Sequence, residues 1–155
     1  MNKTCCFIGH REIKESEELE QKVYSIVEKL ILEEMVDTFL FGSKSRFNSL
    51  CLEVVTKFKE NHPHIKRIFV RAEYPIINED YRKYLLESYE DTYYSKAAEG
   101  AGRAVYIKRN CEMIEKSGFC VFYYTEENLP KKRKSGTRIA LDFALSKKKK
   151  IILLP

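Results

Sequence analysis

The sequence has no long hydrophobic run. No window approaches the roughly 20 apolar residues that a membrane-spanning helix needs, so we expect no membrane association. The N-terminal apolar stretch is too short for a secretory signal, because His10 and Arg11 soon interrupt it. We therefore expect a cytoplasmic protein.

The sequence also lacks paired cysteine motifs. None of its five cysteines forms a CxxC, which leaves a zinc ribbon or a thioredoxin-like site without support. An odd number of cysteines in apolar stretches indicates reduced thiols in a core. Adjacent Cys5 and Cys6 should point to opposite faces of a strand. We expect neither a metal nor a cofactor.

Two common phosphate-binding motifs are missing as well. The chain contains no Walker A sequence and no GxGxxG. Their absence disfavours a P-loop triphosphatase and a dinucleotide-dependent oxidoreductase.

What the chain does contain is typical of one globular domain. It has 155 residues, of which 44% are hydrophobic and 33% charged. The net charge of +5 is uneven, because residues 101–155 carry 13 lysines and arginines against 5 acidic residues. Much of this excess lies in "KKRK" (131–134) and "KKKK" (147–150). Such runs favour nucleic acid or a small anion, or they are a solvated loop and a helix end.

Short β-rich runs alternate with helical periodicity along the whole chain. Strands are predicted at 4–8, 37–41, 65–70, 119–124 and 150–155, with a short one within 90–98. Helices are predicted at 16–35, 47–60, 78–89, 102–117 and 136–148. This alternation predicts an α/β fold, a Rossmann-like three-layer sandwich with a mostly parallel central sheet, formed by a single domain over 1–155.

Polar loops follow the predicted strands where such sheets bind ligands. Gly9, His10 and Arg11 follow the first strand, and "GSKSRF" (42–47) follows the second. "KSGT" (134–137) precedes the last helix, whose N-terminus suits a phosphate group. Simpler readings exist for two of these loops: His10 is a surface histidine and Arg11 pairs with a carboxylate, while Ser135 or Thr137 caps the last helix.

Four segments together resemble the SLOG superfamily, the Rossmann-like group of DprA-type DNA-processing proteins and LOG-type nucleotide hydrolases. They are "CCFIGHR" (5–11), "GSKSRFNSLCLE" (42–53), "RNCEMIEKS" (109–117) and "SGTRIALDFA" (135–144). Their order and spacing are most similar to small bacterial YpsA-like proteins. In that group the motifs read "TGHR", "GGALGFDTLAAE", "RNRYMVDRS" and "GGT" followed by "YA".

The resemblance implies a nucleotide-binding or nucleotide-sensing protein. Its ligand would be a phosphorylated molecule containing ribose, such as one derived from NAD or ADP-ribose. The ligand-binding residues that it implies are Gly9, His10, Arg11, Gly42, Ser43, Phe47, Arg109, Asn110, Ser135, Gly136 and Thr137. We assign no catalytic residue.

Two rival functions remain. LOG-type hydrolases carry "GGxGTxxE", but Ala140 stands at the position of that glutamate. Asp142 is turned by about 200° around the helix, while Glu53 matches another glutamate of the family. A DprA-like DNA-binding role is the other rival, and its support is the basic C-terminal third. We rank nucleic acid behind a nucleotide-like small molecule as the partner, with homo-oligomers as a further option.

Overall fold

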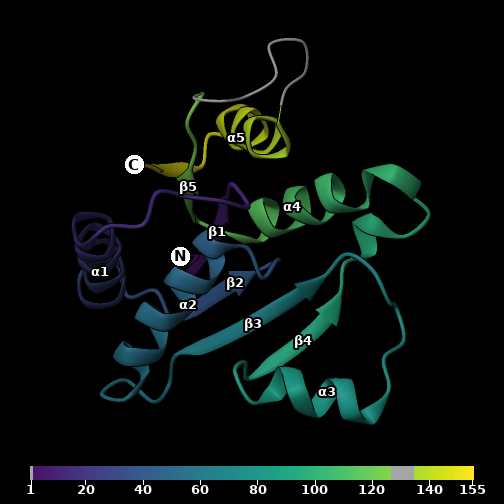
Figure 1. Ribbon diagram of the computed structural model, residues 1–155, viewed down its shortest axis with the longest axis horizontal. Helices are drawn as coiled ribbons and strands as arrows, with labels where there is room; N and C mark the ends of the chain where they lie inside the picture. The colour runs from purple at the N-terminus through teal and green to yellow at the C-terminus, as the bar shows by residue number, and fades with distance from the viewer. Residues whose placement is uncertain (1, 127–134) are drawn as a thin grey trace.

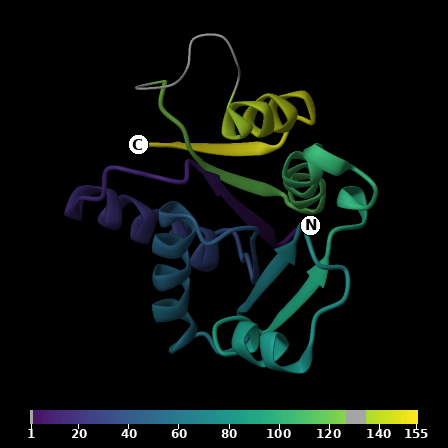
Figure 2. The same ribbon diagram turned by 45° about the vertical axis from the view of Figure 1, so that its right-hand side comes forward.

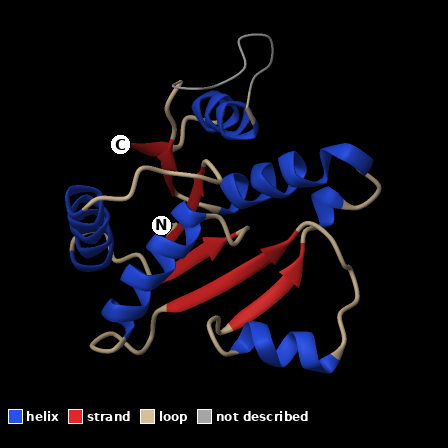
Figure 3. Cartoon of the chain, viewed as in Figure 1, coloured by secondary structure: helices blue, strands red, loops and turns tan. Residues whose placement is uncertain are grey.

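The computed structural model describes residues 2–126 and 135–155, which form a Rossmann-like α/β domain around one six-stranded sheet (Figures 1 and 3). Every neighbouring pair of strands is parallel, and the strand order is β4-β3-β2-β1-β5-β6. The strands are β1 (Thr4–Gly9), β2 (Thr38–Phe41), β3 (Lys66–Arg71), β4 (Asp91–Tyr94), β5 (Phe119–Tyr123) and β6 (Lys150–Leu154). The sheet is strongly twisted, as Figure 2 shows by the different directions of β4 and β6.

Five α-helices connect the strands. They are α1 (Glu17–Leu32), α2 (Arg46–Lys59), α3 (Glu79–Leu86), α4 (Val105–Lys116) and α5 (Gly136–Ser146). Two 3-10 turns, η1 (Lys96–Ala98) and η2 (Gly102–Ala104), lie between β4 and α4. The N-caps Ser16, Ser45 and Ser135 each accept a hydrogen bond from the backbone N–H three residues on.

Alternate residues of the strands supply two apolar layers. Cys5 of β1 faces α1, α2 and α3, whereas its neighbour Cys6 faces α4 and α5. Helices therefore cover both faces of the sheet, as Figure 1 shows for α1 and α2 on one side and α4 and α5 on the other. All five cysteines are free thiols, and only Cys111 is partly exposed. Burial raises the pKa of Cys5 and Cys51.

The predicted elements all occur, with different ends. The first helix stops at Leu32 rather than Met35, whose positive φ of 58° is incompatible with a continuing helix. The helix predicted from 102 begins at Val105, because η2 precedes it. The last helix ends at Ser146, so "KKKK" follows the helix. Within that run, Lys147 pairs with Glu115 at 3.1 Å. "KKRK" (131–134) lies outside the described residues.

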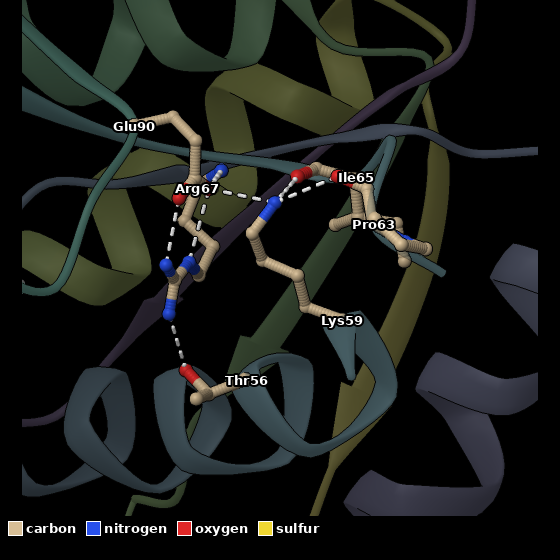
Figure 4. Close-up of polar contacts among 6 residues, drawn as sticks. All are labelled: Thr56, Lys59, Pro63, Ile65, Arg67 and Glu90. Carbon is tan, nitrogen blue, oxygen red and sulfur yellow. Dashed lines mark hydrogen bonds and ion pairs between the residues drawn. The ribbon is translucent and has the colours of Figure 1, made fainter. Parts of the chain in front are cut away.

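A polar network fastens the end of the sheet where β3 and β4 begin (Figure 4). The Arg67 guanidinium donates to both carboxylate oxygens of Glu90, at 3.0 and 2.7 Å, and to the Thr56 hydroxyl at 2.9 Å. Lys59 donates to the carbonyls of Pro63 and Ile65 and lies 3.8 Å from Glu90. This network joins α2, β3 and the residue before β4.

No helix in the described ranges is both long and apolar enough to cross a membrane.

Candidate functional site

A cavity of about 630 Å³ lies at the carboxyl ends of the strands. Ten of the eleven residues that the sequence singled out line it. Residues from the ends of β1, β2 and β3, from α4 and from the start of α5 therefore meet at one edge, as the parallel topology predicts. The ten are Gly9, His10, Arg11, Gly42, Ser43, Arg109, Asn110, Ser135, Gly136 and Thr137.

Phe47 is the exception. Its side chain is fully buried, and its ring packs against Phe7 and Tyr123. A Cβ atom on Gly9 would lie 2.5 Å from the Phe47 ring, so glycine is required there for packing. Phe47 therefore lies beneath the loop and does not line the cavity, whereas its motif predicts a ligand contact.

His10 is held against the segment that follows β5. Its Nε2 atom lies 3.0 Å from the backbone nitrogen of Thr125, and its ring centroid lies 5.4 Å from that of Tyr124. The same Nε2 atom lies 3.0 Å from the Thr125 carbonyl oxygen, so a neutral ring either accepts from the N–H, with its proton on Nδ1, or donates to the carbonyl, with its proton on Nε2. The neighbouring Arg11 side chain is exposed and makes no hydrogen bond or ion pair with another described residue.

The loop after β2 is organised by Asn48. Its Oδ1 atom accepts from the backbone N–H groups of Gly42 and Ser43, at 3.2 and 3.4 Å. Its Nδ2 atom donates to the Phe7 carbonyl at 3.3 Å. These two loop N–H groups already have partners, and the Ser43 hydroxyl donates to Ser45 Oγ at 3.0 Å and accepts from the Ser45 N–H at 3.3 Å, so the loop itself is closed by internal hydrogen bonds.

Arg109 reaches from α4 across Gly42. Its Nη1 atom donates to the Gly42 carbonyl, and its Nε atom donates to Asn110 Oδ1 at 3.1 Å. A Cβ atom on Gly42 would lie 2.8 Å from Arg109 Nε, which explains the glycine. Burial lowers the pKa of Arg109 to about 10, and the charge of Glu73 acts in the other direction. The side chain therefore stays cationic at neutral pH, with no ion pair to a described carboxylate.

Arg71 is a lining residue that the sequence analysis did not identify. It ends β3 and is 8% exposed. Its Nη1 atom donates to the Thr92 hydroxyl at 2.9 Å, and its Nε atom donates to the Tyr74 carbonyl at 3.2 Å. Burial lowers its pKa. The rule that selected Gly9 and Gly42, a position at a strand end, would also have selected Arg71.

Aromatic side chains form another part of the lining. Tyr74, Tyr81 and Tyr106 all border the cavity, and Tyr74 and Tyr106 are more than half exposed. Tyr74 has a positive φ of 61°, a backbone conformation that is uncommon for tyrosine. The Tyr106 hydroxyl donates to Glu73, the only acidic side chain among the described lining residues.

The start of α5 offers free backbone donors. Ser135 Oγ accepts from the Arg138 N–H at 3.1 Å, while the N–H groups of Gly136 and Thr137 have no partner among the described residues. A Cβ atom on Gly136 would meet no atom of the described residues within 4 Å. A helix N-terminus with unpaired N–H groups attracts anions.

The cavity is strongly basic. Its described lining contains the four cations Arg11, Lys44, Arg71 and Arg109 against the single carboxylate of Glu73. A neighbouring cavity of about 700 Å³ shares His10 and Arg11. There, acidic and basic side chains are mixed, so it lacks this excess of one charge.

The residues that bear on hydrolysis lie apart from the cavity. Ala140 is 2% exposed and packs in the layer under α4 and α5. Asp142 pairs with Arg138 at 3.0 Å, and Glu53 is exposed. None of the three lines the described cavity.

The fold and this cavity define a Rossmann-like α/β domain with a basic ligand-sized cavity at the carboxyl edge of a six-stranded parallel sheet. Neither the known protein-family models nor the curated proteins contain a match to the chain.

Proposed function

We propose that the chain binds or senses a nucleotide-like molecule that contains a phosphorylated ribose. One observation carries the proposal: the free N–H groups at the start of α5 and the buried guanidinium of Arg109 face one basic cavity. The volume of about 630 Å³ lies in the range of small-molecule sites. The resemblance of four segments to SLOG proteins, closest to the YpsA-like group, supports the same class of ligand.

The lining suggests how such a ligand would lie. A phosphate group would lie beside Ser135 at the start of α5 and accept hydrogen bonds from the backbone N–H groups of Gly136 and Thr137. His10 and Arg11 would contact ribose or phosphate. The base would lie on the exposed rings of Tyr74 and Tyr106, since aromatic faces stack readily on planar rings.

Hydrolysis of the N-glycosidic bond receives less support. That chemistry needs a carboxylate beside the sugar, and Ala140 fills the corresponding position with a buried methyl group. DNA binding also ranks lower, because the basic residues of the described lining surround a cavity of small-molecule size.

Calorimetric titration with AMP, NAD and ADP-ribose tests the proposal. We expect binding of at least one of these by the unmodified protein and a large loss of affinity in Gly136→Val. The added side chain projects into open space, so it blocks the phosphate without disturbing the fold. Gly136→Ala is the matched control and should show a smaller loss. Absence of binding by the unmodified protein would refute the proposal.

Mass spectrometry of the small molecules released by heat from protein purified from its host would identify the natural ligand. A phosphorylated ribose compound is the expected result, and a ligand without phosphate would contradict it.

A further inference from the structure

Two buried arginines in the cavity wall have no carboxylate within ion-pair distance among the described residues, although Glu73 and the Tyr106 ring lie near Arg109. Arg71 and Arg109 are 8% and 7% exposed, and neither forms an ion pair with a described carboxylate. Burying an unpaired cation is costly, and proteins normally pair such groups. A buried cation at a cavity wall that lacks an ion pair within the protein indicates that an anion from outside the chain binds to it.

Each guanidinium uses two of its three nitrogen atoms for hydrogen bonds within the protein, which leaves the third for a ligand. Arg71 uses Nε and Nη1 for the Tyr74 carbonyl and the Thr92 hydroxyl. Arg109 uses Nε and Nη1 for Asn110 and the Gly42 carbonyl. The Nη2 atom of each has no partner among the described residues, and neither is a buried unpaired atom. Each Nη2 atom therefore keeps some exposed surface, and both residues line the cavity.

The anchoring of Arg71 is itself well supported. The Thr92 hydroxyl that accepts from Arg71 donates in turn to the Phe69 carbonyl at 2.8 Å. The Tyr74 carbonyl is aimed at Arg71 by a residue with positive φ. An arginine held on two sides by neutral groups is preorganised to bind an anion, because little side-chain freedom remains to be lost.

This subsite is separate from the start of α5. Arg71 ends β3, whereas α5 follows β5, and β2 and β1 lie between those two strands. Three steps of about 4.8 Å separate the strands, roughly 14 Å in all. One phosphate group cannot contact both places.

We propose that the ligand carries two separate phosphate groups, one at the start of α5 and the second at Arg71 with Arg109. The inference rests on the proposed function and narrows its ligand to a nucleotide phosphorylated at two positions. Adenosine 3′,5′-bisphosphate is the probe for this class, and AMP is the matched ligand that lacks the second group.

The test compares the two probes by calorimetry on the unmodified protein and on Arg71→Met. We expect the unmodified protein to bind the bisphosphate about tenfold or more tighter than AMP, as one charge-assisted contact allows. Arg71→Met should abolish that preference while changing the affinity for AMP less than about threefold. Its Tm without ligand should not fall, because an unpaired buried cation is replaced and Thr92 keeps its bond to Phe69.

Arg67→Met is the matched control on the same strand. It leaves Glu90 without its main partner, so its Tm should fall while the preference for the bisphosphate is retained. Equal affinity of the unmodified protein for AMP and the bisphosphate would overturn the second subsite and leave the proposed function standing. So would an undiminished preference in Arg71→Met.

A thermal-shift test with inorganic phosphate distinguishes the proposed nucleotide binding from the proposed second phosphate subsite. Phosphate should raise the Tm of the unmodified protein and of Gly136→Val, but have less effect on Arg71→Met. If no nucleotide binds while this Arg71-dependent effect persists, the proposed function fails and the anion subsite stands. If phosphate acts equally on Arg71→Met, the subsite fails.

Discussion

Arg67 and Arg71 lie near opposite ends of β3, and of the two only Arg67 has a carboxylate partner among the described residues. Arg67 binds both oxygens of Glu90, whereas Arg71 contacts the neutral Thr92 hydroxyl and Tyr74 carbonyl. Four residues apart, the two side chains emerge from the same face of the strand. At the start of the strand, Arg67 is therefore part of an ion pair within the protein. At the end of the strand, the Arg71 cation contacts only neutral groups of the described residues. This difference separates a structural contact from a candidate binding contact.

The pair at Glu90 predicts a pH dependence of stability. Partial burial alone would raise the pKa of Glu90, but the hydrogen bonds and charge of Arg67, with Lys59, hold that pKa below its usual value. A carboxyl group whose pKa is lower in the folded state stabilises the fold at pH values above its unfolded-state pKa, which is about 4.3. That contribution is lost as the pH falls through the lower folded-state value.

Glu90→Gln should therefore lower the free energy of unfolding at pH 7 by about 1 kcal/mol, as expected for a partly exposed pair. It should also flatten the decline in stability below about pH 5. Urea unfolding at a series of pH values measures both effects. Glu28→Gln is the control, because Glu28 is exposed and has no ion pair with a described residue. An identical pH profile for Glu90→Gln and the unmodified protein would contradict this account.

Gly9 and Gly136 should respond in opposite ways to alanine. The new Cβ atom at Gly9 would lie 2.5 Å from the buried Phe47 ring, which is itself packed against Phe7. Gly9→Ala should cost about 1–3 kcal/mol of stability, as overpacking does in a dense core. Gly136→Ala adds its Cβ atom to open space and should change stability by less than about 0.5 kcal/mol. Chemical denaturation of both variants checks the difference, and equal losses would show that Phe47 yields to the new atom.

Much of the fold is readable from the sequence because its elements depend on local patterns. The apolar run "CCFI" and the periodic residues of α1 each signal their element, and strand–helix alternation then determines a parallel sheet. The same topology predicts that Gly9, Gly42 and Gly136 meet at one edge, and all three line one cavity.

Other features of the fold and the site could not be predicted from the sequence, because they depend on contacts between segments that are distant in the chain. Nothing local shows that Asn48 accepts from the loop it follows, or that the Phe47 ring lies beneath Gly9. The position of Arg71 directly after the third predicted strand could have been read from the sequence, but its contacts with the neutral Thr92 hydroxyl and Tyr74 carbonyl could not. Glu73 likewise joins the lining through its contact with Tyr106 from α4.

Hydrolysis of nucleoside monophosphates is expected to be absent. Incubation should release no ribose 5-phosphate above a control without protein, because Ala140 stands at the sequence position where the LOG-type motif carries its glutamate. A colorimetric assay for the released sugar phosphate provides the measurement. Turnover that disappears in Glu73→Gln would refute the prediction and assign the reaction to the cavity's one described carboxylate. Turnover that disappears in Glu53→Ala would also refute the prediction, and it would assign the reaction to an exposed residue that does not line the cavity.

The last prediction separates a small anionic ligand from DNA by salt dependence. DNA would contact several phosphates through "KKRK", and neutralising four of them would lower affinity by about 100-fold between 50 and 200 mM salt. A nucleotide held by the Gly136 and Thr137 N–H groups and by Arg109 should lose far less, since most of these contacts are buried or uncharged. Replacing Lys131, Lys132, Arg133 and Lys134 with serine should therefore weaken nucleotide binding only slightly, whereas Gly136→Val should weaken it strongly. Calorimetry with ADP-ribose, beside a salt series with single-stranded and duplex DNA, measures both responses. Tight, steeply salt-dependent DNA binding that the four-residue replacement abolishes, together with no nucleotide binding by the unmodified protein, would favour the DNA-binding function instead.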